Sequence, residues 1–272
     1  MNNFKNIAIA IFLLVPVGLY SQEKSKKFVP VEGQEGKDVP WIPTPQLLVD
    51  KMLDMAKITP SDYLVDLGSG DGRLVITAAK RGTKALGIEY NADMVAVARE
   101  NAAKAGVGTM AQFVKADVFE YDFSKATVVI MFLLPELNMK LRPKLLNMKP
   151  GTRILTNTFT MQDWKADETV TTGIAEDRWN KAYMWIVPAK VKGAWSLNKG
   201  EELVLDQKFQ VITGALKNAG KSTTITSGKL RGNEITFTCG EQVYKGIVSG
   251  SRMEGSVTAK GKTERWTAKF GK

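Results

Sequence analysis

The chain has 272 residues, and its 44% hydrophobic and 24% charged content is that of a globular protein rather than a disordered or fibrous one. It contains no histidine and one cysteine, Cys239, which excludes histidine zinc sites, Ser-His-Asp triads, thiolate metal clusters and internal disulfides. No metal site is therefore expected. The net charge is +10, and from Val191 onward 14 lysine and arginine residues stand against 7 acidic ones. Such a basic module is either a solvated surface or one that attracts nucleic acid, an anionic membrane or acidic proteins.

The first 22 residues have the layout of a secretory signal peptide, with a short basic head, an apolar run over residues 7–20 and a polar stretch from Ser21. A membrane anchor is the second interpretation, because a membrane span needs roughly 20 apolar residues. The segment thus predicts a protein that is exported, to the periplasm or the envelope, or held at a membrane by its N-terminus.

A linker rich in Lys, Glu, Gly and Pro is predicted over residues 23–38. Thr44 is the expected N-cap of a helix that reaches about Lys57. Strands and helices then alternate up to about residue 158. Strands are expected over residues 63–67, 85–89, 113–115, 128–134 and 153–158, and helices over 72–80, 91–105 and, interrupted by Pro143, 136–148.

This alternation predicts an α/β domain over residues 39–190, with a parallel sheet covered on both faces. From residue 191 to 272 the helical period disappears. Seven short strand-like runs separated by turn signals predict an antiparallel module, closed as a small barrel or stacked as a sandwich. Cys239 is expected at a buried strand position. This module is interpreted as a basic docking surface, an apolar ligand cavity or a rigid appendage.

A glycine-rich loop follows the first strand and opens the next helix, with the sequence Asp66-Leu67-Gly68-Ser69-Gly70-Asp71-Gly72-Arg73. Glycines at this place let the backbone approach a ligand beside a helix N-terminus. The dinucleotide fingerprint needs a third glycine at position 73, where this chain has arginine. The G-x-G-x-G spacing after an acid resembles instead the first motif of class I S-adenosylmethionine (SAM) dependent methyltransferases. The resemblance implies a Rossmann-like seven-strand fold with SAM as cofactor.

Two further acids follow successive strands. Glu89 ends the second strand, where a carboxylate can accept both ribose hydroxyl hydrogens. By resemblance, Asp117 accepts from the adenine amino group, Val118 offers its backbone, and Asp66 holds the methionine end of the cofactor. The predicted cofactor-binding residues are Asp66, Gly68, Ser69, Gly70, Gly72, Glu89, Asp117 and Val118.

Over residues 39–165 the chain also resembles the seven-β-strand protein-lysine methyltransferases that modify mitochondrial ATP synthase c-subunits and the adenine nucleotide carrier. The resemblance is carried by segments 40–45, 66–73, 87–91 and 130–135, with a late Phe159 and Trp164. It implies N-methylation of a protein lysine. The β-rich tail and the apparent export signal depart from those relatives and leave the substrate open.

Methyl transfer to an amine requires collinear reactants and exclusion of water. We expect Trp41, Thr44, Phe132 and Phe159 to line the methyl-transfer channel. The [D/N]-P-P-[Y/F/W] motif of amide- and adenine-methylating enzymes is missing, since Leu133-Leu134-Pro135-Glu136 stands in its place. Two alternatives remain: a methyltransferase acting on RNA or a small molecule, and a non-catalytic exported SAM-binding module.

Overall fold

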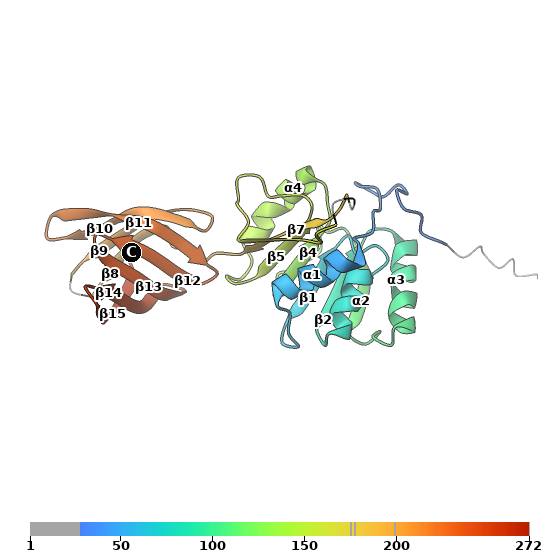
Figure 1. Ribbon diagram of the computed structural model, residues 1–272, viewed down its shortest axis with the longest axis horizontal. Coiled ribbons are helices and arrows are strands. Elements are labelled where there is room, and N and C mark those ends of the chain that lie inside the picture. The colour runs from blue at the N-terminus through green and yellow to red at the C-terminus, as the bar shows by residue number, and fades with distance from the viewer. Residues whose placement is uncertain (1–27, 175, 177, 199, 272) are drawn as a thin grey trace, which may run out of the picture.

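The computed structural model describes residues 28–174, 176, 178–198 and 200–271, so the predicted signal peptide or anchor over residues 1–22 lies outside the described part. Among the described helices, none combines the length and apolarity needed to cross a bilayer. Two structural units follow one another along the chain: a sheet flanked by helices, and a β barrel (Figure 1).

The first unit is built on a seven-stranded sheet with the order β3-β2-β1-β4-β5-β7-β6. The first five strands are parallel, while β7 runs antiparallel to β5 and to β6. The predicted α/β class is thereby confirmed, and two strands after β5 add an antiparallel edge. The strands are β1 Tyr63–Leu67, β2 Lys84–Glu89, β3 Ala111–Lys115, β4 Val128–Met131, β5 Arg153–Asn157, β6 Glu168–Thr171 and β7 Lys181–Ile186.

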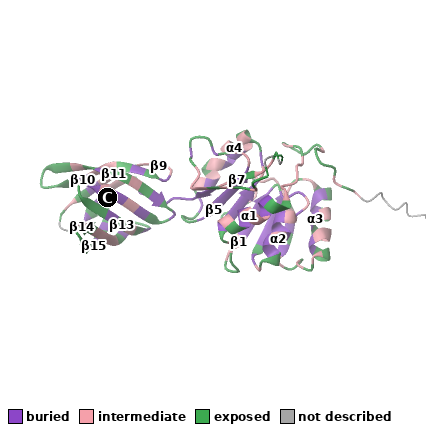
Figure 2. Cartoon of the chain, viewed as in Figure 1, coloured by how far each residue is buried: buried purple, intermediate pink, exposed green. Residues whose placement is uncertain are grey.

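Helices cover both faces of this sheet. Side chains of β1 and β4 alternate between two buried clusters, which is why the central strands contain almost only apolar residues. One cluster packs under α1, α2 and α3, and the other packs under α4. Figure 2 shows the resulting buried interior. The helices are α1 Gln46–Ala56, α2 Arg73–Lys80, α3 Ala92–Lys104 and α4 Pro135–Leu146.

Three local predictions are wrong. Pro45, not Thr44, is the N-cap of α1, and no side chain caps that helix. Pro143 does not interrupt α4, because Leu141 and Leu145 on either side of it are buried and hold the helix against the sheet. Strand β4 ends at Met131, so Phe132 lies beyond the strand at the edge of the sheet.

The second unit is a closed eight-stranded antiparallel barrel, which decides between the two predicted architectures. An eight-stranded barrel is just wide enough to be filled by side chains. Here Trp195, Phe237, Tyr244 and Trp266 are buried inside, and the rings of Phe237 and Tyr244 stack at 4.6 Å. Cys239 is buried at the end of its strand, as predicted. The strands are β8 Gly193–Leu197, β9 Glu202–Lys208, β10 Val211–Asn218, β11 Lys221–Arg231, β12 Glu234–Cys239, β13 Gln242–Ser249, β14 Arg252–Ala259 and β15 Lys262–Phe270.

The β9–β10 turn of the barrel packs on the segment that connects β5 to β6. The ring of Phe209 stacks on the buried Trp164 at 5.7 Å, and the guanidinium of Arg142 lies 5.3 Å from the same Phe209 ring. The amide of the buried Gln210 donates to the Lys165 carbonyl at 2.7 Å. The two units are therefore joined by apolar packing as well as by the chain.

Opposite charges meet across the same contact. These ion pairs balance part of the excess positive charge of the C-terminal module, because three of its cations face acids of the first unit. The pairs are Lys208–Asp163 at 3.2 Å, Lys229–Asp167 at 3.6 Å and Arg231–Glu168 at 2.5 Å.

The barrel lies at the N-terminal edge of the sheet. Gly232 approaches Gly151, just before β5, and its carbonyl accepts from the Ala189 amide at 2.8 Å. Glu168, which pairs with Arg231, begins β6. The C-terminal ends of the parallel strands, at the opposite edge, stay clear of the barrel.

Candidate functional site

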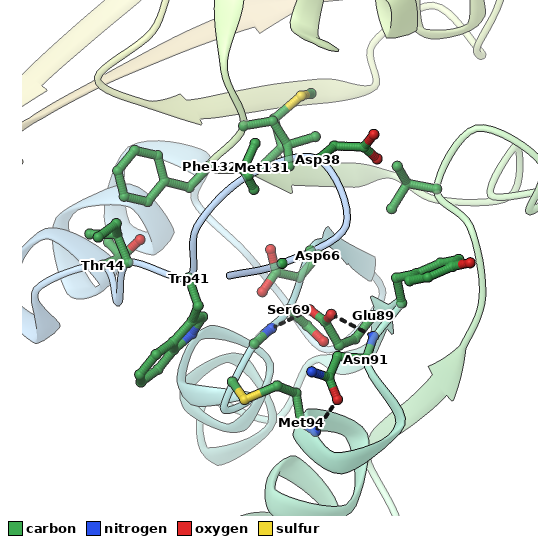
Figure 3. Close-up of a pocket in the computed structure, with 18 of the residues that line it drawn as sticks. Asp38, Trp41, Thr44, Asp66, Ser69, Glu89, Asn91, Met94, Met131 and Phe132 are labelled. Carbon is green, nitrogen blue, oxygen red and sulfur yellow. Dashed lines mark hydrogen bonds between the residues drawn. The ribbon is translucent and has the colours of Figure 1, made fainter. Parts of the chain in front are cut away.

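A pocket opens at the C-terminal ends of β1, β2 and β4 (Figure 3). In open α/β sheets, ligands bind at the C-terminal edge of the strands where the strand order reverses. In this sheet the order reverses between β1 and β4. One wall consists of the loop after β1, and a second wall consists of residues 34–44, which precede α1. Part of the predicted linker, residues 34–38, thus belongs to the site.

The glycine loop is held close to the end of β2. The amides of Gly68 and Ser69 both donate to the Ile88 carbonyl, at 2.9 and 3.1 Å. Gly68 and Gly70 have φ values of 81° and 51°, which favour glycine. A side chain at position 70 would also collide with Trp41, because a Cβ there would lie 2.4 Å from the indole nitrogen.

Glu89 links this loop to the next helix. One carboxylate oxygen accepts from the Gly70 amide at 3.0 Å, and the other accepts from the Asn91 amide at 2.9 Å. Each carboxylate oxygen has a second lone pair, so both can still accept from a hydroxyl. Asn91 in turn caps α3, as predicted, by accepting from Asp93 and Met94. Glu89 is therefore positioned to receive a ribose diol.

Asp66 is buried at the end of β1, with 6% of its surface exposed. Burial, reinforced by the negative charges of Glu89 and Asp71, raises the pKa of Asp66 to about 8. Nearby, the Ser69 hydroxyl is buried and has no hydrogen-bond partner among the described residues. The Asp66 carboxyl lines the pocket, and a cationic ligand group would stabilise its charged form.

Asp117 and Val118 line the opposite end of the pocket. One oxygen of Asp117 accepts from the Phe119 amide at 2.8 Å, and the other pairs with Lys37 at 2.5 Å. The Lys37 ammonium also lies 4.5 Å from the centre of the Tyr90 ring. The hydrogen bond from Lys37, followed by that from Phe119, lowers the pKa of Asp117.

On the side of the pocket away from Glu89, Thr44 and Phe132 lie together (Figure 3). The amide of Asn157, which is 1% exposed at the end of β5, donates to the Thr44 hydroxyl at 3.2 Å. The Thr44 carbonyl accepts from Arg73 at 3.1 Å. Three uncharged side chains from separate segments, Thr44, Phe132 and Asn157, thus line this part of the pocket, and the charged group beside them is the Arg73 guanidinium.

Most of the predicted site residues meet in this pocket. Trp41, Thr44, Phe132 and seven of the eight predicted cofactor-binding residues line it. Gly72 does not, since it begins α2 and packs against Phe113. Phe159 does not line it either, but its ring lies 6.2 Å from that of Phe132.

Three features of the site are absent from the sequence-based prediction. Residues 34–38 have a linker-like composition, so nothing in the sequence marks them as pocket wall. Asn157 follows an apolar strand, where a buried polar residue is a usable signal. Trp179 lies between β6 and β7, 5.2 Å from the Phe132 ring.

This arrangement fits S-adenosylmethionine. Asp66 suits the methionine end with its ammonium group, and Glu89 suits the ribose. Asp117 and Val118 lie where an adenine would reach them. In the glycine loop, position 70 has no room for a side chain, because a Cβ there would meet the Trp41 indole.

Comparisons with known proteins agree with the geometry. A family model described as the ANTKMT methyltransferase domain matches residues 66–168. A protein-lysine N-methyltransferase from Saccharolobus islandicus is 45% identical over 135 residues, which are 48% of this chain and 84% of the relative. The lysine N-methyltransferase of the ATP synthase c-subunit from Mus musculus is 35% identical over 137 residues. That match covers 50% of this chain and 55% of the mouse enzyme, so the chain spans only about half of that relative.

Among solved structures, an RNA methyltransferase from Salinibacter ruber in complex with S-adenosyl-L-homocysteine is similar. It shares 43% sequence identity and a TM-score of 0.51, over 55% of this chain and 96% of that one. The fold, the pocket and these relatives together identify the chain as a member of the class I SAM-dependent methyltransferase family to which the Saccharolobus islandicus protein-lysine N-methyltransferase belongs.

Proposed function

We propose that this chain methylates the side-chain amine of a lysine residue in a protein. The proposal is supported by the relatives, since the Saccharolobus islandicus and Mus musculus proteins are both described as lysine N-methyltransferases. The similar Salinibacter ruber structure is described as an RNA methyltransferase, so the relatives alone do not decide the substrate. The acceptor side of the pocket provides a second, independent argument.

The observation that carries the proposal is the uncharged character of that side. Its side chains Thr44, Phe132 and Asn157 are uncharged, while Asp66 and Glu89 belong to β1 and β2 and Asp117 follows β3. A lysine ammonium must lose its proton before it can act as a nucleophile, and an apolar surrounding lowers the pKa of an amine. This environment therefore produces the neutral amine without a histidine base.

SAM supplies an electrophilic methyl group on a sulfonium sulfur. The residues of the chain hold the acceptor in line with that group. The Thr44 hydroxyl oxygen can accept an N–H hydrogen of a neutral amine, which leaves the amine lone pair free to point at the methyl group. Asn157 holds Thr44 in place, because its amide donates to Thr44 while its carbonyl oxygen accepts from the Thr158 hydroxyl at 2.9 Å. Phe132 excludes water from the same side.

Nucleic acid is the competing substrate class. The basic surplus that would attract it lies on the barrel, at the sheet edge opposite the pocket, and Lys208, Lys229 and Arg231 already face acids of the chain itself. The [D/N]-P-P-[Y/F/W] motif that positions a nucleobase amine is also missing. Both points favour a protein substrate.

The test is transfer of labelled methyl from SAM into soluble and cell-envelope extracts, followed by separate protease and nuclease digestion. Gly70→Arg is the inactive control, because any side chain at position 70 meets Trp41. Protease-sensitive label, found on lysine by mass spectrometry and absent from the control, is the expected result. Nuclease-sensitive label would replace the proposal with an RNA substrate. SAM binding without label in any extract would indicate a small-molecule substrate or a non-catalytic binding module.

The location of the enzyme stays a prediction that rests on residues 1–22. A reporter that is active only outside the cytoplasm, fused after the exposed Phe270, leaves the pocket intact. Reporter activity would support export, and its absence would support a domain held inside.

A further inference from the structure

The chain makes a tight turn directly after β5, where Asn157 lines the acceptor side of the pocket. The backbone amide of Phe159 donates to the backbone carbonyl of Asn157 at 2.6 Å, so the turn contains only three residues. Thr158, its central residue, has a φ of 61°. A three-residue turn with a positive φ at its centre is the rare, strained form of the γ-turn. The backbone is therefore strained next to a residue of the acceptor side.

Hydrogen bonds to the surrounding structure hold this turn in place. The Thr158 amide donates to the carbonyl of Lys181 in β7 at 2.7 Å, and the Thr156 hydroxyl donates to the Phe159 carbonyl. Strained backbone persists only where its surroundings fix it, and it is concentrated at functional sites. Glycine adopts a positive φ without strain, whereas a β-branched residue such as threonine rarely adopts it. The threonine at this position therefore points to a use for its side chain.

The Thr158 side chain bonds to the side chain that precedes it. Its hydroxyl donates to the side-chain carbonyl oxygen of Asn157 at 2.9 Å. Successive side chains of an extended strand point to opposite faces, so Thr158 reaches this oxygen because the backbone turns between the two residues. The nitrogen of the same Asn157 amide donates to the Thr44 hydroxyl at 3.2 Å. Three side chains thus form one hydrogen-bonded series, which ends at the acceptor side of the pocket.

We propose that Thr158 is a positioning residue for methyl transfer. Its hydroxyl fixes the amide of Asn157, which in turn holds the Thr44 hydroxyl where the acceptor amine is proposed to lie. Thr158 itself does not line the pocket, so it acts through these two side chains. Orientation matters here because the transfer needs collinear reactants. The effect on the acceptor rests on the proposed function, whereas the hold on Asn157 does not.

Four variants separate the hydroxyl from the backbone strain. Thr158→Val keeps the branched shape without the hydroxyl, Thr158→Ser keeps the hydroxyl, and Thr158→Gly removes the hydroxyl together with the strain. Thr160→Val is the control, because Thr160 is exposed and lies two residues further along the chain. The rate to be measured is single-turnover transfer of labelled methyl from pre-bound SAM into soluble and cell-envelope extracts.

Thr158→Val and Thr158→Gly should both lower this rate about fivefold to twentyfold, while the affinity for S-adenosyl-L-homocysteine stays within about twofold. Thr158→Ser should restore the rate, and Thr160→Val should leave it unchanged. Thr158→Gly should have a higher Tm than Thr158→Val, because glycine relieves the strained φ. Equally low rates at different stabilities are not expected of a residue that only supports the fold.

A second measurement needs no acceptor. NMR of the ¹⁵N-labelled chain with S-adenosyl-L-homocysteine bound follows the side-chain amide of Asn157, whose signal is assigned by its absence from Asn157→Ala. Hydrogen bonds at both ends of this amide should make its protons exchange with water at least about tenfold more slowly than in Thr158→Val. Thr158→Ser should keep the slow exchange.

A parent-like rate or parent-like exchange in Thr158→Val would overturn the proposal, and so would a Thr158→Ser variant that behaves like Thr158→Val. Methyl label on a molecule other than a protein lysine, combined with exchange that depends on the hydroxyl, would refute the proposed function and leave the hold on Asn157 standing. If no extract accepts label, the exchange measurement alone decides whether Thr158 holds Asn157.

Discussion

The amide of Asn157 donates to the Thr44 hydroxyl over 3.2 Å, although 113 residues separate the two in the chain. Thr44 belongs to the segment that precedes α1, and Asn157 ends β5. The bond therefore ties the N-terminal wall of the pocket to the sheet, at the place where the acceptor amine is proposed to lie.

Replacing Asn157 with alanine should lower the rate of methyl transfer about 10- to 100-fold, because Thr44, which is proposed to orient the acceptor, loses its support. The affinity for SAM should change less than about twofold, since Asn157 lies away from the residues proposed to hold the cofactor. Single-turnover kinetics and calorimetry measure the two quantities. Equal losses in the transfer rate and in the affinity for SAM would show that Asn157 only supports the fold.

Asp66→Asn should stabilise the ligand-free chain in a pH-dependent way. The folded pKa of about 8 lies above the ordinary value of 3.8, so the folded chain binds more protons between these pH values. The contribution of Asp66 to stability is thus complete below pH 3.8 and is lost as the pH rises through 8. Asparagine carries no such loss, so the gain in Tm should be larger at pH 9 than at pH 6.

Asp117→Asn is the matched control for this experiment. Its pKa is lowered, chiefly by the hydrogen bond from Lys37, so its contribution to stability is lost as the pH falls and not as it rises. Thermal unfolding of both variants at the two pH values gives the comparison. A gain from Asp66→Asn that does not depend on pH would contradict the raised pKa. Asp66→Asn should also lose SAM binding.

A methyl group at position 70 should weaken SAM binding about tenfold or more, because Gly70→Ala must displace the Trp41 indole or distort the loop. Gly106→Ala is the control, with a similarly positive φ of 71° and no atom within 4 Å of the new Cβ. It should lower stability without affecting SAM affinity. Equal affinities in the two variants would show that Trp41 moves freely out of the way.

Lys37→Met should tighten SAM binding about twofold to fivefold at low ionic strength, because it frees Asp117 for the adenine amino group. Lys37→Arg keeps the charge and should leave the affinity near that of the parent chain. The difference between the variants should shrink as salt is added. Weaker binding of SAM to Lys37→Met would mean that Lys37 contacts the cofactor instead.

Lys229→Met should lower the free energy of unfolding by about 1–3 kcal/mol, because Asp167 has a fully buried carboxylate whose Oδ1 then has no partner. Lys217→Met removes a lysine whose pair with Glu202 is half exposed on both sides, and it should change stability by less than about 1 kcal/mol. Denaturant unfolding measures both. Adding Asp167→Asn should restore much of the loss, and a failure to do so would contradict the charge argument.

Much of the sheet could be predicted because its signals are local. Tyr63–Leu67 is apolar apart from Asp66, and Asn91 is a capping residue directly before the helix α3. Glu89 and Asp117 are recognisable as acids at strand ends, since parallel strands bring those ends to one edge. The class of the fold and the SAM pocket follow from these local patterns.

The other features depend on contacts between distant parts of the chain. Lys37 meets Asp117 across 80 residues, and Thr44 meets Asn157 across 113. The strand β6 escapes prediction because Val170 is its only apolar residue, whereas the apolar run of β7 is a usable signal that the prediction leaves out. In the barrel, Gly246 and Gly255 lie inside β13 and β14, at places where a Cβ would strike the backbone of the neighbouring strand.

The stacking of Phe209 on Trp164 makes the barrel part of the core of the catalytic unit. Trp164 is fully buried, and its carbonyl accepts from the indole of Trp185 in β7, so the contact reaches the sheet itself. A fragment that ends near residue 190 would present one face of this indole, and the carboxylate of Asp167, to water. The two units should consequently melt together in a single cooperative transition, and the barrel cannot be cut away as an independent module.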